Sequence, residues 1–434
     1  MARVCMLLHN PLISDARVER EARALARAGH QVTIVATWEP GLTAREERRD
    51  GVTIRRVSRR PLGVDLITRL FALLLHQDDR SADAPAPDPP QGPTVRGVLR
   101  MPVVATRRVL RRLPTKRFAI EWRMALAAMR TRPDVVHAHD LNTLAAGVRA
   151  ARWSRARLVY DSHEISAGLP SVKHPEHVIA HERGLIGRAD AVIHTTPMRA
   201  AWAAETYGIP TPTLVRNVPE GARDVRPLDL AEAGGFAPGT RVILHQGNMS
   251  PDRGLEALVD AMGSLDGFGL LLLGGGALRG ELERRVGRAG LGDRVRFRSS
   301  VPHEELLGWT AGAWCGASLL VDTCLNHRYS LPNKLFEYLA VGVPLIASNN
   351  PEIARFVTEH GCGELCDPAD PASIAAAVKR LADRYESARR ATRSAGEGFR
   401  WENEERTLLG VYDRLLGPKL LTSSGAAGAP RAGS

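Results

Sequence analysis

The feature that most constrains this chain is an alternation of short apolar runs with helical patterns, which starts twice along the sequence. The first series has an expected strand at 4–8, a polar loop, a helix at 18–28 and a strand at 32–36. After a stretch with the composition of a linker, the second series starts with an expected strand at 242–245. Such alternation is typical of a parallel sheet with helices on both faces. The sequence therefore predicts an α/β protein with two Rossmann-like, doubly wound parallel-sheet domains.

The length of 434 residues, with 44% hydrophobic residues, allows a large core and exceeds the size of one ordinary domain. Further strands are predicted at 52–57, 134–138, 158–160, 191–193, 214–215, 270–273, 295–297, 317–321 and 343–347. The predicted organisation is a first domain at 1–218 with an insertion at about 62–132, a linker at 219–240, a second domain at 241–400, a helix at 401–416 that returns to the first domain, and a disordered tail at 417–434. Two such domains would face each other across a cleft, where ligands commonly bind.

Composition excludes several classes of protein. The five cysteines are scattered and form no Cys-x-x-Cys pair, which indicates a reduced, cytoplasmic chain with no zinc site. The first ten residues lack the layout of a signal peptide and are expected to form the first strand directly. No apolar run approaches the roughly 20 residues that span a membrane. We therefore expect a cytoplasmic protein.

Positive charge is concentrated in one segment. The formal net charge is +11, and residues 96–132 contain eleven arginines and lysines against a single acid, Glu121. A preceding stretch at 81–92 is rich in Pro, Asp and Ala and is expected to be mobile. Within the segment, 98–113 mixes apolar residues with arginine at roughly helical spacing, which suits an anionic membrane surface. The alternative is a solvated arginine-rich helix, and one basic stretch without aromatic interleaving is weak support for a nucleic-acid partner.

A motif near position 334 combines the features of an anion site. Ser330 is a good helix cap, and Pro332 suits the first turn of a helix, where its missing N–H is not needed. Free backbone N–H groups at such a helix start, together with the helix dipole, can bind a diphosphate. Lys334 adds a positive charge, and Glu337 lies on the same helix face, where its carboxylate can accept hydrogen bonds from two vicinal hydroxyls, as on a ribose. The alternative is a capped surface helix with a Lys–Glu pair.

A second motif follows the first strand of the second series. The loop 247–254 stands between that strand and an expected helix at 255–262, the place where open α/β sheets bind ligands. Arg253 in this loop can donate a fork of hydrogen bonds to a diphosphate leaving group, whose neutralisation is the main demand in breaking a sugar–phosphate bond. An exposed loop arginine is the alternative. After the next strand, Gly274 and Gly275 are expected to let a nucleotide approach closely, although a tight turn would use them equally.

Together these motifs resemble family 4 glycosyltransferases, a large retaining family with the GT-B fold. The stretch from Pro332 to Pro344 matches the motif Pro-x-Lys-x-x-Glu-Tyr-x-Ala-x-Gly-x-Pro, and the likeness extends from His9 to about Leu415. The resemblance implies that the second domain binds a nucleotide sugar, linked to UDP or GDP, and that the first binds the acceptor. The residues it implies for the donor are Arg253 and Lys334 on the diphosphate, Glu337 on the ribose, and Gly247, Asn248, Gly274, Gly275, Ser330, Leu331, Pro332 and Asn333 around them.

The resemblance also reaches the first domain, where the loop 9–17 matches the loop that faces the acceptor and the phosphates. The residues that it suggests for the acceptor or the cleft are Asn10, Asp15, Arg17, His139 and Asp140. His163 follows a strand and matches a histidine that lies beside the donor sugar in related enzymes, with a buried structural histidine as the alternative. His245 lies inside an expected strand and is predicted to be a core residue.

Some positions depart from the family pattern. Most members have a glutamate eight positions before the one matching Glu337, where it contacts the transferred hexose, and here that position is Tyr329. The usual Arg after Gly247 is Asn248, and the usual Lys is Arg253. The diphosphate can still be held, but the departures leave the identity of the donor sugar open.

The resemblance leads us to expect a retaining hexosyl transfer in which the leaving phosphate oxygen helps to remove the acceptor proton. No Asp-x-Asp metal motif is recognised, so activity is expected without a metal or another cofactor. A glycan, a lipid-linked precursor or a small molecule is the expected acceptor, in the biosynthesis of cell-surface glycans or natural-product glycosides. One alternative is a GT-B sugar-nucleotide 2-epimerase, which needs no acceptor. The other is a non-catalytic protein that binds membrane or nucleic acid through its basic segment.

Overall fold

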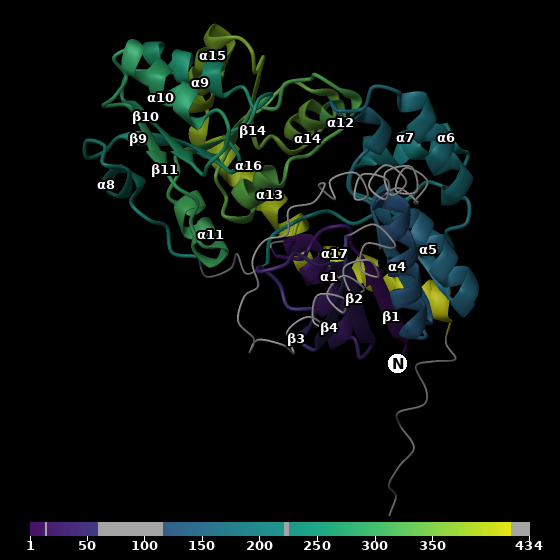
Figure 1. Cartoon of the computed structure of the whole chain (residues 1–434). Coiled ribbons are helices and arrows are strands. Elements are labelled where there is room, and N and C mark those ends of the chain that lie inside the picture. The colour runs from purple at the N-terminus through teal and green to yellow at the C-terminus, as the bar shows by residue number, and fades with distance from the viewer. Residues whose placement is uncertain (14, 60–115, 221–224, 418–434) are drawn as a thin grey trace, which may run out of the picture. The chain divides into compact units, whose positions relative to one another are not determined.

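The computed structural model describes residues 1–13, 15–59, 116–220 and 225–417, which form two sheets flanked by helices (Figure 1). The predictions of a mobile stretch at 81–92 and of a basic helix at 98–113 lie outside the described residues, and so does the tail from 418. The basic segment is described only from 116 onward, where α4 spans Lys116–Arg130.

The first sheet has eight strands in the order β3-β4-β2-β1-β5-β6-β7-β8. Their bounds are β1 Arg3–Leu7, β2 Gln31–Thr37, β3 Glu46–Arg49, β4 Val52–Val57, β5 Val135–His139, β6 Arg157–Ser162, β7 Ala191–His194 and β8 Thr213–Leu214. β1 pairs in parallel with β2 on one side and with β5 on the other. Helices cover both faces of such a strand, and this explains why four of the five residues of β1 are buried and apolar.

The helices of this part are α1 Ala16–Arg27, α4, α5 Leu141–Ser154, the short η1 Ser166–Gly168, α6 Pro175–Ile186 and α7 Pro197–Tyr207. α5 lies directly on the sheet beside α4 (Figure 1). Gly147 makes this close approach possible, because a Cβ atom there would lie 2.9 Å from the Cβ of Ala138. A larger residue at this position would push α5 away from β5.

The second sheet has six strands in the order β11-β10-β9-β12-β13-β14, and each of its ladders is parallel. Its strands are β9 Arg241–Gln246, β10 Phe268–Leu273, β11 Val295–Arg298, β12 Cys315–Ser318, β13 Leu345–Ser348 and β14 Gly363–Cys366. Its helices are α8 Leu230–Gly234, α9 Leu255–Ala261, η3 Met262–Ser264, α10 Arg279–Arg288, α11 His303–Ala311, α12 Leu325–Arg328, α13 Asn333–Ala340, α14 Pro351–His360, α15 Pro371–Asp383 and α16 Tyr385–Gly398. A continuous core joins the sheet to its helices, with Leu258, Leu270 and Val378 fully buried.

By their contacts the residues form two compact units, Met1–Leu158 and Val159–Ser434, and the boundary falls inside β6. The last helix, α17 (Trp401–Leu416), packs beside β8 within the second unit. Glu404 of α17 accepts hydrogen bonds from the backbone N–H of Arg216 at 2.7 Å and from its guanidinium at 3.1 Å. Because Glu404 is buried, this charged pair fixes the C-terminal helix against the end of the first sheet.

Most of the predicted strands are present within one or two residues, and 52–57 is confirmed without any shift as β4. The strand predicted at 317–321 is wrong in its bounds: β12 is Cys315–Ser318, and the apolar run continues through the buried Leu319 and Leu320 after the strand has ended. β14 was not predicted, since it is a short strand with a single aliphatic side chain.

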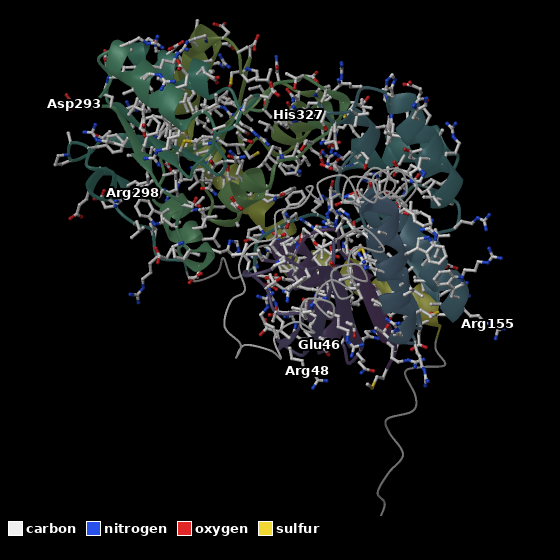
Figure 2. The ribbon with its side chains drawn as sticks, viewed as in Figure 1. Glu46, Arg48, Arg155, Asp293, Arg298 and His327 are labelled. Atoms are coloured by element: carbon white, nitrogen blue, oxygen red, sulfur yellow. The ribbon has the colours of Figure 1, made fainter. Side chains whose placement is uncertain are left out.

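β3 was not predicted either, because all four of its residues are charged. It pairs antiparallel with β4 at the edge of the sheet. Glu46 and Arg48 point outward from it (Figure 2). Within the described part of the chain, every helix is too short or too polar to cross a membrane.

Candidate active site

Two glycine-containing loops meet at the carboxyl ends of β9 and β10. Gly274 has a φ of +141°, and a Cβ atom there would lie 2.1 Å from the carbonyl oxygen of Gly247. The backbone N–H of Met249 donates to the carbonyl of Gly275 at 2.7 Å. The glycines therefore let the loop after β10 support the loop after β9. Their close approach to a nucleotide remains a prediction, with Gly247 and Asn248 exposed at the same edge.

Arg253 ends the loop after β9, immediately before Gly254, the cap of α9. It is half-buried, and burial lowers the pKa of its guanidinium, an effect that the neighbouring Asp252 opposes. Its Nε lies 3.5 Å from the hydroxyl oxygen of Ser250. Arg253 is therefore not an exposed loop arginine, and its contact with a diphosphate stays a prediction.

Lys334 lies beside the ring of His245, with its Nζ 3.3 Å from Nδ1 and 3.4 Å from Nε2. The pKa of Lys334 is lowered to about 7, first by burial and then by the positive charge of Arg253, while Glu337 opposes the shift. His245 is buried, as predicted, and its pKa falls well below the usual value because of burial and the charges of Lys334 and Arg253. His327 of α12 shows the same trend, since burial and then Arg253 lower its pKa. In the second unit, burial and neighbouring positive charges thus disfavour the protonated forms of Lys334, His245 and His327.

The start of α13 differs from the prediction. The helix begins at Asn333 with Pro332 as its N-cap, and no side chain caps it. The prediction that Ser330 caps this helix is wrong: the backbone N–H of Ser330 donates to the carbonyl of His327 at 3.2 Å, so Ser330 belongs to the turn that follows α12. Pro332 fixes the chain just before the helix. The first helical amides are those of Asn333 and Lys334, because the amide of Leu335 already donates to the carbonyl of Pro332 at 3.0 Å. Leu331 is buried beside them.

Gln246, the last residue of β9, holds the carboxylate of Glu337. Its side-chain amide donates to Glu337 Oε2, and its carbonyl oxygen accepts from the hydroxyl of Thr310 at 2.9 Å. Gln246 is only 2% exposed. A hydrogen bond to a charged group in such a setting restricts which way the carboxylate points. The sequence did not indicate this role, because the three residues come from separate elements of the second sheet.

His163 follows β6, as predicted, and is partly exposed. Its Nε2 lies 3.2 Å from Asp161 Oδ2, and its backbone carbonyl accepts a hydrogen bond from Arg199 at 2.5 Å. Arg199 is buried and also donates to Asn326 Oδ1 at 2.7 Å. Arg199 therefore ties the His163 loop to α12, and sequence reasoning missed it. Tyr329 stands at the end of α12, where its carbonyl accepts from the hydroxyl of Thr196 at 2.8 Å.

In the first unit, the loop residues proposed for the acceptor shape the start of α1. Asn10 donates to Asp15 Oδ2 at 2.9 Å, and Asp15 accepts from the backbone N–H of Val18 at 3.3 Å. Arg17 is only 4% exposed, and its Nε lies 3.0 Å from Glu21 Oε1. Arg17 is thus engaged inside the unit, and a contact between its guanidinium and an acceptor stays a prediction.

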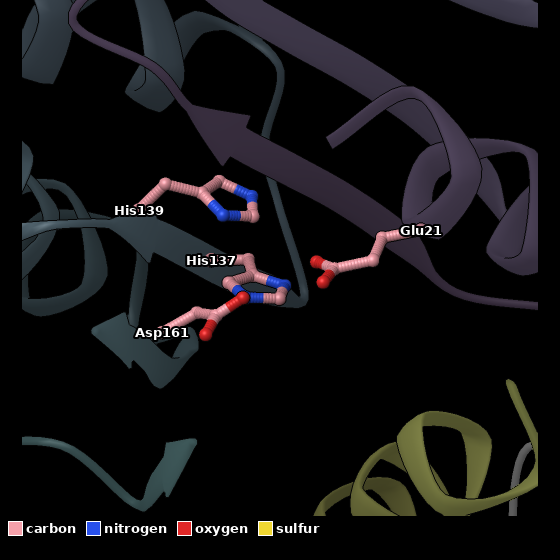
Figure 3. A group of neighbouring side chains, drawn as sticks. All are labelled: Glu21, His137, His139 and Asp161. Carbon is pink, nitrogen blue, oxygen red and sulfur yellow. The ribbon is translucent and has the colours of Figure 1, made fainter. Parts of the chain in front are cut away.

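His139 belongs to a buried group with His137 and Glu21 (Figure 3). The two imidazoles stack with centroids 4.3 Å apart, and one potential ligand atom from each of the three side chains lies within 4.8 Å of the others. These are metal-ligand types, but the Arg17 guanidinium already contacts Glu21, and its positive charge disfavours a divalent cation there. Asp140 follows with φ 60° and ψ 165°, a conformation that few residues other than glycine adopt.

Comparison with known proteins gives concordant results. A family model described as "Glycosyl transferases group 1" matches residues 240–384, and one described as "Glycosyl transferase 4-like domain" matches residues 14–219. The chain is 28% identical to a D-inositol 3-phosphate glycosyltransferase of Acidothermus cellulolyticus, over 83% of this chain and 84% of that protein. It is 27% identical to the lipopolysaccharide core biosynthesis glycosyltransferase LpsD of Rhizobium meliloti, over 70% of this chain and 81% of that protein.

Solved structures show a similar fold. Sucrose-phosphate synthase from Thermosynechococcus elongatus superposes with a TM-score of 0.69 at 18% identity, covering 96% of this chain and 99% of that one. HepE of Anabaena in complex with UDP gives a TM-score of 0.68 at 15% identity, covering 95% and 100%. HepE has also been solved in complex with UDP-glucose, and this structure gives a TM-score of 0.65 at 16% identity, covering 95% of this chain and 100% of that one.

Proposed function

Because this chain belongs to the group 1 glycosyl transferases of the family 4 type and has their GT-B fold, we propose that it moves a hexose-type sugar from a nucleoside diphosphate to an acceptor hydroxyl with retention. That it is a glycosyltransferase follows from the family. The donor, the stereochemistry and the roles of individual residues are the proposal.

The observation that carries the proposal is the crowding of Arg253, Lys334 and His245 at one edge of the second sheet. Burial and, after it, the positive charge of Arg253 lower the pKa of Lys334, so the two cations oppose each other when no anion is bound. A diphosphate placed among them would relieve this repulsion and accept charge-assisted hydrogen bonds. Side chains held in place before the reaction can stabilise the charge that develops as the diphosphate leaves.

In the proposed reaction, the bond between the anomeric carbon and the β-phosphate oxygen breaks. The acceptor oxygen forms a bond to that carbon on the same face, and the acceptor proton passes to the departing phosphate oxygen. Arg253 and Lys334 stabilise the diphosphate, together with the first amides of α13. This assignment needs neither a carboxylate nucleophile nor a metal.

Glu337 is proposed to bind the ribose hydroxyls of the nucleotide, oriented by Gln246. Structures of HepE, a protein of similar fold, contain UDP and UDP-glucose, which supports a uridine nucleotide here, with a GDP-sugar as the second donor to test. A relative named for lipopolysaccharide core biosynthesis supports a glycan or lipid-linked acceptor. Such an acceptor would suit a protein that visits the membrane surface through its basic segment at 96–132.

A thermal-shift screen with UDP- and GDP-sugars tests donor binding, and mass spectrometry of products formed from a cell extract tests transfer. We expect one nucleotide class to raise the melting temperature, and Arg253→Ala and Glu337→Ala to weaken this shift. Arg284→Ala is the control, because Arg284 is exposed on α10 and pairs with Glu281. Full activity of both Arg253→Ala and Glu337→Ala would contradict the proposed donor site. Conversion of the donor without any acceptor would favour an epimerase.

A further inference from the structure

A cavity of about 580 Å³ lies at the C-terminal end of α13, lined by Leu339, Val341 and the ring of Phe399 among others. Lys334, in the first turn of the same helix, and Glu337, near its middle, do not line it. Its volume falls within the range of roughly 300–1,000 Å³ that is typical of small-molecule sites. The cavity is therefore a separate feature of the second unit, which the proposed transfer reaction does not use.

Close packing of α16 on α13 builds this cavity. A Cβ atom on Gly396 would lie 2.4 Å from the carbonyl oxygen of Leu339, so α16 touches the backbone of α13. A Cβ atom on Gly342 would lie 2.4 Å from Cγ of Arg393, so the stem of this arginine lies across the end of α13. Thr392, the residue before Arg393, is buried and donates to the carbonyl of Cys362 at 3.1 Å. The position of the arginine is thus set by contacts of its stem.

Three arginines line the cavity: Arg389 and Arg393, four positions apart on α16, and Arg400, the N-cap of α17. Residues four apart on a helix share a face. Across the described ranges of the chain, none of the three forms an ion pair with a carboxylate, whereas Arg380 and Arg384 of the same region both pair with Glu364. Glu397 and Glu402 also line the cavity and are exposed, so arginines outnumber acids there.

The combination of unpaired guanidinium groups with an apolar surface defines the chemistry of an occupant. Arginine is well suited to phosphate, because its planar group donates parallel hydrogen bonds. The partly exposed side chains of Val225, Val341 and Phe399 offer no hydrogen bonds and would contact an apolar or planar body. We propose that this cavity binds a small organic phosphate, with the phosphate on Arg389, Arg393 and Arg400 and the body on the apolar side chains. The site goes beyond the proposed transfer of a sugar.

Titration calorimetry with phenyl phosphate as the probe tests this site. The wild-type protein should bind one equivalent. The double variant Arg389→Gln/Arg393→Gln should bind phenyl phosphate at least about tenfold more weakly, since hydrogen bonds to a charged group are lost. Arg284→Gln/Arg288→Gln is the matched control, an exposed arginine pair four positions apart on α10, and should keep the affinity. Arg253→Ala should also keep it, because Arg253 does not line the cavity.

Glu397→Gln removes a repulsive carboxylate without touching the arginines and should tighten binding. If circular dichroism shows that the double variant Arg389→Gln/Arg393→Gln does not fold, the single variants Glu397→Gln and Arg400→Gln still test the site: the first should bind phenyl phosphate more tightly and the second more weakly. The proposal is overturned if the wild-type protein shows no saturable binding, or if Arg253→Ala abolishes the binding and the cavity variants do not. Equal binding of neutral phenol would also overturn it, because the cavity would then select only for the apolar body. These outcomes leave the proposed sugar transfer untouched.

Discussion

The two units each gather ionisable side chains at the end of a parallel strand, and the two groups differ in how their charges are balanced. At β5, Glu21 is paired with Arg17, and the stacked imidazoles of His137 and His139 complete a buried group. At β9, His245 lies beside Lys334 and near Arg253, and the charges repel. A group that is already balanced contributes to stability, whereas a group with excess positive charge is poised for an anion. Substitutions in the two groups should therefore have different effects on stability and on turnover.

The largest effect is expected from Arg17→Ala. Removing one partner of a buried ion pair leaves Glu21 charged without its partner, which costs about 3–5 kcal/mol of unfolding free energy. Urea denaturation followed by circular dichroism measures the loss. Arg49→Ala is the control, since Arg49 pairs with Glu19 of the same helix at 2.7 Å but is 44% exposed, and exposed pairs contribute about 0–1 kcal/mol. Equal losses in both variants would contradict the distinction.

Arg253→Ala should act on turnover instead. Loss of one preorganised group that stabilises the leaving diphosphate is expected to lower kcat by about 10²–10³-fold. The melting temperature should stay the same or rise, because the substitution removes charge repulsion from Lys334. Steady-state kinetics with the preferred nucleotide sugar and a melting curve give the two values. If the variant loses stability and keeps its kcat, Arg253 contributes to stability, as the group at β5 does, and not to turnover.

Gln246→Leu should have a smaller and more selective effect. Without the amide, Glu337 loses a charge-assisted hydrogen bond, and kcat/KM is expected to fall about tenfold. The fall should be smaller with a 2′-deoxyribose donor, because that donor keeps only one of the two hydroxyls that Glu337 is proposed to bind. Thr310→Val, which removes only the partner of Gln246, should reduce kcat/KM less. An identical loss with both donors would show that Gln246 does not orient a ribose contact.

The smallest effect near neutral pH is a pH dependence. Lys334 has a pKa of about 7, and a bound diphosphate should raise it. Below pH 7 Lys334 is protonated in both the free and the nucleotide-bound protein, so it adds nothing to the pH dependence of nucleotide affinity. Above pH 7 binding must take up a proton, so nucleotide affinity should fall by up to about tenfold per pH unit until the pKa of the complex is reached. Calorimetry in buffers of different ionisation enthalpy counts the proton, and Lys334→Met should abolish it.

The same shift has a consequence for the unliganded protein. The unfolded chain holds the proton of Lys334 up to the ordinary value of 10.5, whereas the folded chain releases it near 7. The unfolded state therefore binds more protons between these values, and the contribution of this group to stability rises with pH across that range. Lys334→Met should remove this rise, which a denaturation series from pH 7 to pH 9 would detect.

The sequence predicted the parts of the candidate site that depend on local pattern. Arg253 and Glu337 were singled out because a loop after a strand and a helix after a proline have recognisable compositions, and their roles stay predictions. Ser330 was assigned to the wrong position, since a serine three residues before a helix and one that caps it look alike until the turn after α12 is known. Gln246 and Arg199 were missed, because their partners lie 91 and 127 residues away.

The charged strand β3 has a consequence for behaviour in concentrated solution. The exposed edge of a sheet offers unpaired N–H and C=O groups to which a neighbouring molecule can add a strand. At this edge every residue, from Glu46 to Arg49, is charged, and a second copy aligned there would have to bury those charges. The charged edge strand β3 therefore opposes edge-to-edge pairing of the first sheet with a second molecule. Apolar residues at these four positions would favour such aggregation.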